Sequence, residues 1–247
     1  MVAACALLVG LALGVPVGAI VYWLFQGGHS TVPSGSIGAA AWHTFSYSAA
    51  AGLVATVAAL PVALLSVRHP GRLPRLLERS TFVVLALPGL VIALALTYFS
   101  NRYAGGFLYQ SSVLLVLAYA LMFFPLALVA VRASVAQSPP ALEEVGRSLG
   151  RPRREVLWRV TLPLVAPGLA AAFCLVFLEA VTELTATLVL IPTGAQTLST
   201  EFWAYQSYFS YSQAAPYAGL MMLIAAVPSY VLGRWFDRLP SRGTVLS

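Results

Sequence analysis

Six long apolar stretches set the strongest limit on what this 247-residue chain can fold into. Each is about as long as the roughly 20 residues that an α-helix needs to cross the hydrocarbon of a bilayer. The stretches cover approximately residues 2–25, 43–67, 80–100, 111–131, 164–190 and 214–233. Only 9% of the residues are charged, against about 25% in soluble domains, so hydrocarbon must cover most of the surface. The sequence therefore predicts an all-α integral membrane protein, with residues 1–247 forming one domain of six transmembrane helices.

The arginines predict how the chain is oriented in the membrane. Thirteen of the 14 arginines fall between the second and third stretches, between the fourth and fifth, or after the sixth. Only Arg102 falls in a connection on the opposite side of the membrane. Because basic residues accumulate in cytoplasmic segments, we expect both termini and the long connection 132–163 to lie in the cytoplasm.

The first apolar stretch, 2–25, differs from a secretory signal peptide. No basic segment precedes it, and its apolar run is longer than the about 7–15 residues of a signal-peptide core. We interpret it as the first spanning helix. The missing basic flank leaves open that further sequence, up to a whole upstream half, precedes it.

The composition also excludes several kinds of chemistry. All 14 basic residues are arginine, so the chain lacks the lysine that a P-loop or a Schiff base requires, and ATP would have to be bound by another chain. Cys5 and Cys174 are isolated within apolar runs, and His29, His43 and His69 are far apart in the sequence. These residues predict neither a disulfide framework nor a metal cluster. We therefore expect a chain with no catalytic residue, no metal site and no cofactor.

The cytoplasmic connection 132–163 has the pattern of two short helices joined at a glycine. Ser138 is a favourable N-cap, and Pro139 fits the first position of a helix. Gly150 suits the left-handed position that ends this helix, and a second helix is expected over 153–160. The apolar residues that share one face of the first helix are Leu142, Val145 and Leu149. Such a face indicates a protein partner, while the surrounding arginines leave open contact with anionic lipid headgroups.

The spacing in this connection resembles the EAA loop of binding-protein-dependent ABC importer permeases. The family pattern is E-A-A, three residues, G, nine residues, I, one residue, L-P. The matching residues here are Glu144-Val145-Gly146, Gly150, Val160 and Leu162-Pro163. The replacement of an alanine by Gly146 weakens the first helix by up to ~1 kcal/mol. The match keeps its register over the whole segment, which makes it a specific signal.

This resemblance implies a type I ABC importer permease with several partners. Glu144 and Gly150 would contact a cytoplasmic ATPase subunit and set the bend of the loop, and Leu162-Pro163 would join the loop to the fifth span. The implied partners are two ATPase subunits, a second permease half from the same or another chain, and an external solute-binding protein. The implied location is the inner membrane of a bacterium, in contact with its lipids, and nothing points to nucleic acid.

The fifth apolar stretch, 164–190, contains two acidic residues. Glu179, Glu183 and Thr187 recur at i, i+4 and i+8, which places them on one face of a continuous helix. A charge at the centre of a bilayer costs ~2.5–3.5 kcal/mol on insertion scales, so both glutamates should face protein or water. At ~1.5 Å per residue they lie about 24 and 30 Å above Pro163, in the outer half of the membrane. We interpret the three residues as part of a substrate pathway, with packing or an interfacial position as the alternative.

The residues around the end of this stretch resemble the ferric-iron branch of these permeases, in which an E-L-x-A-T-L run is followed by P-x-G, T-L and a tryptophan. The matching residues are Glu183-Leu184-Thr185-Ala186-Thr187-Leu188, Pro192, Gly194, Thr197-Leu198 and Trp203. The G-E-F-G-A-T version favoured by the sulfate and molybdate branch is absent. The resemblance covers nearly the whole chain, which is most like the C-terminal half of fused permeases with two six-helix halves. It implies ferric iron as the substrate.

Other substrates and other classes of protein stay open. Phosphonate, thiamine and polyamine are alternatives within the family. A secondary transporter would show internal inverted repeats, and no clear repeat is present. An intramembrane hydrolase would need a reactive group in facing spans, whereas His43 lies at the edge of one. The aromatic residues of the external connection fit an interfacial belt or a docking surface for the binding protein; they are Trp203, Tyr205, Tyr208, Phe209 and Tyr211.

Overall fold

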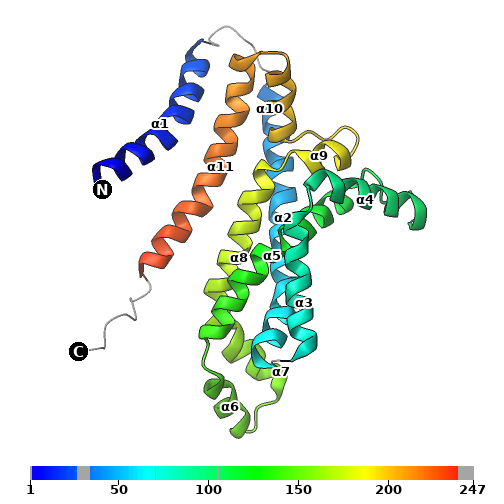
Figure 1. Ribbon diagram of the computed structural model, residues 1–247, viewed down its shortest axis with the longest axis vertical. Coiled ribbons are helices and arrows are strands. Elements are labelled where there is room, and N and C mark those ends of the chain that lie inside the picture. The colour runs from blue at the N-terminus through cyan, green and yellow to red at the C-terminus, as the bar shows by residue number, and fades with distance from the viewer. Residues whose placement is uncertain (1, 27–33, 70, 105, 239–247) are drawn as a thin grey trace.

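The computed structural model describes residues 2–26, 34–69, 71–104 and 106–238, and most of these residues are helical (Figure 1). The long helices are α1 (Val2–Gln26), α2 (Ser34–Arg68), α5 (Ser112–Gln137), α8 (Leu162–Thr182) and α11 (Tyr211–Arg238). The shorter ones are α3 (Arg72–Val83), α4 (Gly89–Tyr103), α6 (Pro140–Ser148), α7 (Arg153–Val156), α9 (Thr185–Leu190) and α10 (Leu198–Ser207). Among the described residues, five helices are long and apolar enough to cross a membrane, and the bent pair α3 and α4 makes a sixth if it is counted as one span. The prediction of an all-α membrane protein is confirmed.

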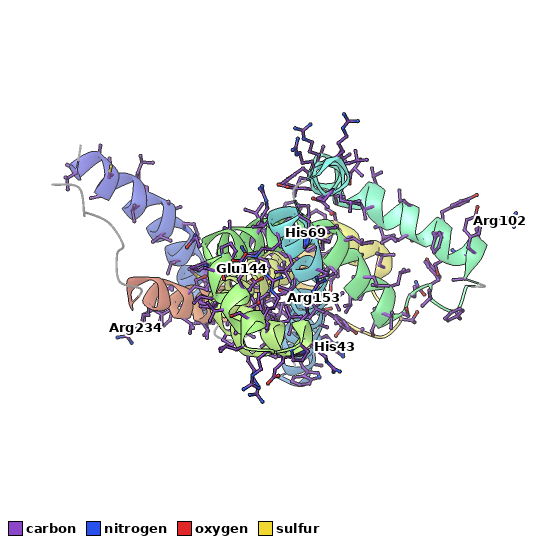
Figure 2. All side chains as sticks on the ribbon, turned by 90° about the horizontal axis from the view of Figure 1, so that it is seen from below. His43, His69, Arg102, Glu144, Arg153 and Arg234 are labelled. Carbon is purple, nitrogen blue, oxygen red and sulfur yellow. The ribbon has the colours of Figure 1, made fainter. Side chains whose placement is uncertain are left out.

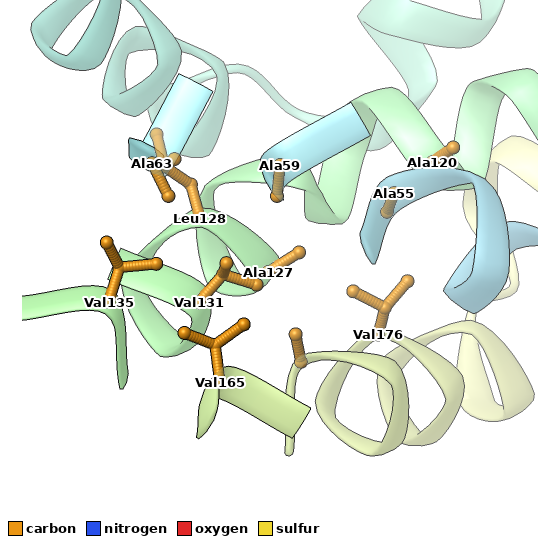
Figure 3. Packing of buried hydrophobic residues seen from close by; sticks show 11 residues of the cluster. Ala55, Ala59, Ala63, Ala120, Ala127, Leu128, Val131, Val135, Val165 and Val176 are labelled. Carbon is orange, nitrogen blue, oxygen red and sulfur yellow. The ribbon is translucent and has the colours of Figure 1, made fainter. Parts of the chain in front are cut away.

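The core of the bundle is formed by α2, α5 and α8 (Figure 3). Along α2, a row of fully buried alanines faces the other two helices. The row consists of Ala51, Ala55, Ala59 and Ala63. Between α5 and α8, Gly168 lies so close that a Cβ added there would stand 2.2 Å from the Cβ of Ser134. Because lipid gives no hydrophobic driving force between helices, close packing of small residues is what holds such a bundle together.

α1 lies outside this core and runs beside α11 (Figure 1). The rings of Trp23 and Tyr211 join the two helices, with their centroids 5.2 Å apart. No residue of α1 is buried. Lipid or another chain must therefore cover most of this helix.

The third predicted span, 80–100, is not a continuous helix. α3 ends at Val83, a 3₁₀ turn follows, and α4 begins at Gly89 with its axis bent by 108° from that of α3. Leu87 and Pro88 hold extended ψ angles of 129° and 139°. Proline disfavours the helical conformation at the residue before it and cannot donate an N–H, so the helix breaks here. The prediction of one straight span is wrong at this point.

The fifth predicted span, 164–190, is also interrupted. α8 ends at Thr182, Glu183 has φ −68° and ψ 125°, and a new helix, α9, begins at Thr185. Glu179 and Glu183 therefore do not follow one another on a continuous helix. The prediction that Glu179, Glu183 and Thr187 form one polar face of a continuous helix is therefore wrong.

The first helix of the connection 132–163 begins one residue later than predicted. Ser138 is the C-cap of α5, Pro139 precedes the next helix, and Pro140 is its first residue. The N-cap predicted at Ser138 is therefore wrong. The first helical position is still occupied by a proline. Proline is tolerated there because an N–H at this position would have no acceptor within the helix.

Cysteine labelling tests the orientation that the arginines predict. In a chain whose Cys5 and Cys174 are replaced by alanine, a cysteine at the exposed Ser148 of α6 should react with an impermeant maleimide only after permeabilisation. A cysteine at the exposed Ser112, on the opposite side, should react in intact cells. Ser199 is unsuitable because it is buried and its hydroxyl donates to the main-chain oxygen of Glu183. Labelling at Ser148 in intact cells would contradict the orientation.

Candidate coupling loop and transport pathway

α6 stands at one end of the molecule, beyond the ends of the core helices (Figure 1). The three apolar residues that the sequence places on one face are uncovered: Leu142, Val145 and Leu149 are 44%, 54% and 76% exposed. An apolar face of this kind at the end of a membrane bundle is suited to insertion into a groove of a partner protein.

Gly150 ends α6 as the sequence predicts. Its φ of +78° lies in the left-handed region. The N–H of Gly150 donates to the carbonyl of Arg147, and the N–H of Arg151 donates to that of Gly146. These two bonds form a Schellman motif, which turns the chain sharply and satisfies the last carbonyls of the helix.

Gly146, which departs from the family pattern, has a packing role. A Cβ at this position would stand 3.1 Å from Cγ2 of Val156 in α7. The glycine therefore allows α6 to approach α7 more closely than an alanine would. Its low helix propensity is the only effect visible in the sequence, whereas this contact is visible only in the fold.

The two adjacent glutamates of α6 have different surroundings. Glu143 is half-buried, and its Oε1 accepts hydrogen bonds from Nη2 and Nε of Arg68 at 2.9 and 3.2 Å. Glu144 is exposed and lines a cavity of about 580 Å³ with Arg147 and Arg153. Figure 2, which views the molecule from below, shows Glu144 and Arg153 near the middle, with Arg102 and Arg234 on opposite flanks. The sequence pattern identifies Glu144 but misses Glu143 and Arg68, because no local spacing shows that α2 ends beside α6.

Leu162 and Pro163 lie where the loop joins α8. Leu162 packs against the buried core, and its N–H donates to the carbonyl of Leu157, five residues earlier. This bond belongs to a π turn over Leu157–Thr161. Pro163 has no N–H for the carbonyl four residues before it, which explains the altered register of the turn. The helix predicted over 153–160 is therefore continuous with α8 rather than separate.

The three residues expected to line a pathway fall into different environments. Glu179 is exposed and lines a cavity of about 290 Å³ together with Leu87 and Met122. Glu183 is half-buried, and its Oε1 accepts hydrogen bonds from the N–H of Ala186 at 2.9 Å and from the hydroxyl of Thr185 at 2.7 Å. Its carboxylate thus caps α9, where an anion is favoured by the unpaired N–H groups.

Thr187 is fully buried in α9. Its hydroxyl lies 2.5 Å from that of Tyr119 in α5 and donates to the main-chain oxygen of Glu183 at 2.7 Å. Thr187 therefore fastens α9 to the core rather than facing a pathway with Glu179.

The breaks in the third and fifth spans lie against each other. A Cβ added at Gly89, the first residue of α4, would stand 2.7 Å from Oγ1 of Thr185 and 3.4 Å from Oε1 of Glu183. Only glycine leaves room for the chain at this point. Sequence periodicity misses this contact because it joins two segments far apart in the chain.

The connection between α9 and α10 is held by α2. The N–H of Leu198 donates to Oγ1 of Thr44, and Nδ1 of His43 lies 3.0 Å from the carbonyl oxygen of Gln196. Partial burial raises the pKa of the Glu201 carboxyl in α10, an acidic residue that the sequence analysis did not select. The most exposed aromatic residues of this region are Tyr208 and Phe209, at 82% and 78%.

Metal-ligating side chains do not gather in the part of the chain that the structure describes. There, no group of three or more His, Cys, Asp or Glu residues could hold a metal ion. His43 lies in the N-terminal half of α2, and His69 directly follows the last residue of that helix. His29 lies outside the described residues.

Comparison with known proteins places the chain among transport proteins. A family model described as binding-protein-dependent transport system inner membrane component matches residues 51–244. The chain is 38% identical over 228 residues to the Fe(3+)-transport system permease protein FbpB 2 of Haemophilus influenzae, over 91% of this chain and 45% of that protein. It is 31% identical over 150 residues to the molybdenum transport system permease protein ModB of Mycobacterium tuberculosis, over 57% of each chain. The chain thus spans about half the length of the curated relatives it matches.

Two solved structures share the fold. The MetNI methionine ABC transporter in inward-facing conformations matches with a TM-score of 0.65 and 19% identity, over 81% of this chain and 94% of that chain. A bacterial ABC transporter involved in the import of the acidic polysaccharide alginate matches with a TM-score of 0.64 and 13% identity, over 95% and 96%. At these identities the likeness concerns the fold alone.

Proposed function

We propose that this chain, which belongs to the family of binding-protein-dependent transport system inner membrane components, is the membrane-spanning half of an ATP-driven importer of ferric iron. The observation that carries the proposal is the loop from α6 to α8. It combines an uncovered apolar face, a glycine-terminated turn and an unbroken helical connection into the core. A displacement of a partner docked on α6 is passed directly to α8.

The importer would consist of this chain, a second permease half, two ATPase subunits and an external solute-binding protein. The ATPase would dock on α6, with Glu144 and Gly150 at the contact. The second half would cover apolar surface that the monomer leaves open, such as Leu94 and Tyr98 of α4, which are 54% and 66% exposed. The complex would lie in a bacterial inner membrane with both termini of this chain in the cytoplasm.

Ferric iron as cargo is supported by the similarity to the Haemophilus influenzae protein and by the charge of the external side. Ferric iron is a hard cation, and hard cations prefer oxygen ligands such as carboxylates. Glu179 offers an exposed carboxylate beside a cavity between the broken third span and α5. We assign the contact with the passing cation to Glu179, and the support of the pathway wall to Glu183 and Thr187.

Replacing the carboxylate of Glu179 tests the cargo assignment. Glu179→Gln is expected to lower iron uptake about tenfold, because a loss of ~1.4 kcal/mol of attraction corresponds to that factor. Glu183→Gln is the matched control, since glutamine still accepts the hydrogen bonds that cap α9, and should retain uptake within about threefold. The measurement is radio-iron uptake in cells that carry the ATPase, the binding protein and the second half.

Two outcomes would count against this proposal in different ways. Unchanged uptake in Glu179→Gln would remove this residue from the pathway. Uptake of molybdate in place of iron by the unaltered protein would refute the cargo and leave the importer assignment standing.

A further inference from the structure

We call the segment from Ser138 to Thr161, which contains α6 and α7, the coupling loop. Arg68, the last residue of α2, attaches that helix to the start of this loop. Its guanidinium donates to Oε1 of Glu143 through both Nη2 and Nε and to the main-chain oxygen of Ser138 at 3.0 Å. The side chains of Arg68 and Glu143 are only 13% and 19% exposed. A pair with several hydrogen bonds and little exposure holds its geometry, unlike the mobile ion pairs of a protein surface.

Thr44 and His43, about ten residues after the start of α2 at Ser34, fasten the helix to the chain that leads into α10. Oγ1 of the buried Thr44 accepts the N–H of Leu198, the first residue of α10, at 2.8 Å. Nδ1 of His43 lies 3.0 Å from the carbonyl oxygen of Gln196 and 3.4 Å from its nitrogen. The chain that leads into α10 therefore cannot shift without either moving α2 or breaking these bonds.

Between these two attachments α2 is one helix. At ~1.5 Å per residue, Thr44 and Arg68 are about 36 Å apart, which is more than the ~30 Å thickness of the hydrocarbon core. The face of α2 toward α5 and α8 carries a row of buried alanines with Leu60 and Leu64 packed beside it, so α2 is in close contact with both helices. A helix attached at two points this far apart, one at Thr44 and one at Arg68, carries a displacement from one side of the membrane to the other.

We propose that α2 transmits the movement of the coupling loop to the external connection, and that Arg68 is the positioning residue that attaches the loop to it. The inference rests on the proposed function, because it takes α6 as the docking helix of the ATPase. α6 is then joined covalently to α5 through Ser138 and Pro139 and to α8 through α7, and it has a third, ionic attachment through Glu143 to α2. Glu144, the next residue, stays exposed for the partner.

A charge swap tests the cytoplasmic attachment. The complex of both permease halves with its ATPase is reconstituted in proteoliposomes, and ATP hydrolysis and iron import are measured with and without the binding protein. Arg68→Glu and Glu143→Arg should each lower import and binding-protein-stimulated hydrolysis about tenfold, within the usual range of coupling free energies. Basal hydrolysis should persist, and the double variant with both changes should recover import to within about threefold of the unaltered complex. Arg79→Glu makes the same charge change at an exposed position of α3 and should have no effect.

Thr44 tests the external attachment. Thr44→Val keeps the shape but removes the oxygen that accepts the N–H of Leu198, and should lower import about fivefold while leaving basal hydrolysis unchanged. Thr44→Ser keeps the oxygen and should import normally. Thr44→Ser loses the methyl group of threonine, whereas Thr44→Val loses its oxygen. Normal import in Thr44→Ser would therefore assign the loss in Thr44→Val to the hydrogen bond and not to the packing of the methyl group.

The outcomes separate this inference from the function on which it rests. If the charge swap imports no better than either single variant, or if the single variants keep full stimulation, the role of Arg68 is refuted. Normal import in Thr44→Val would refute transmission through α2. If the unaltered complex shows no stimulation by the binding protein, the proposed function fails and the inference falls with it.

Discussion

Replacing Gly168 by valine is expected to prevent the chain from accumulating as a folded protein. Even the first atom of the new side chain would stand 2.2 Å from the Cβ of Ser134 and 3.1 Å from the main-chain oxygen of Ala130. Overpacking of a core typically costs about 1–3 kcal/mol, and a clash with backbone belongs at the upper end of that range or beyond it. The measurement is the yield of monodisperse protein in detergent and its melting temperature.

The partner residue supplies the matching control. Ser134→Gly removes both of the nearest atoms, so Gly168→Ala combined with Ser134→Gly should recover part of the stability that Gly168→Ala alone loses. Gly14→Ala in α1, where a Cβ meets nothing within 4 Å, should leave the melting temperature unchanged. A stable Gly168→Val protein would show that α5 and α8 do not approach as closely as described.

Replacing Gly150 by valine is expected to uncouple ATP hydrolysis from import without blocking membrane insertion. A β-branched residue held at φ +78° is strained by about 1–2 kcal/mol, so the Schellman turn opens and α6 loses its orientation. Because ~1.4 kcal/mol corresponds to a factor of ten, import should fall by about that factor. The measurement is iron import beside the amount of ATPase that co-purifies, which should also fall.

Gly194 provides a control with the same backbone strain. It lies in the external connection at φ +83°, and a Cβ there would meet nothing within 4 Å. Gly194→Val should therefore leave ATPase association unchanged. If Gly150→Val keeps full import and full ATPase association, α6 is not the docking helix and contact with lipid headgroups becomes the better interpretation of the loop.

The sequence by itself determined the kind of molecule and most of its helices. Length and apolarity alone decide whether a segment can cross a bilayer, so α1, α2, α5 and α11 cover their predicted spans, although α2 begins earlier and α5 and α11 end later than predicted. The left-handed turn at Gly150 was also predictable, because glycine is the residue that such a turn requires. The coupling loop was recognisable for the same reason, since its signal lies in the spacing of neighbouring residues.

Only the tertiary structure decided where two of the spans break and what each acidic residue does. Pro88 permits a break in its span, but the facing break at Glu183 becomes visible only when α4 and α9 lie side by side. Glu143 and Glu144 have the same side chain in adjacent positions, and it is Arg68, far away in the sequence, that draws one inward and leaves the other exposed. Periodicity reports which face of a helix a residue occupies, whereas the role of a charged group depends on the partner that three-dimensional packing brings to that face.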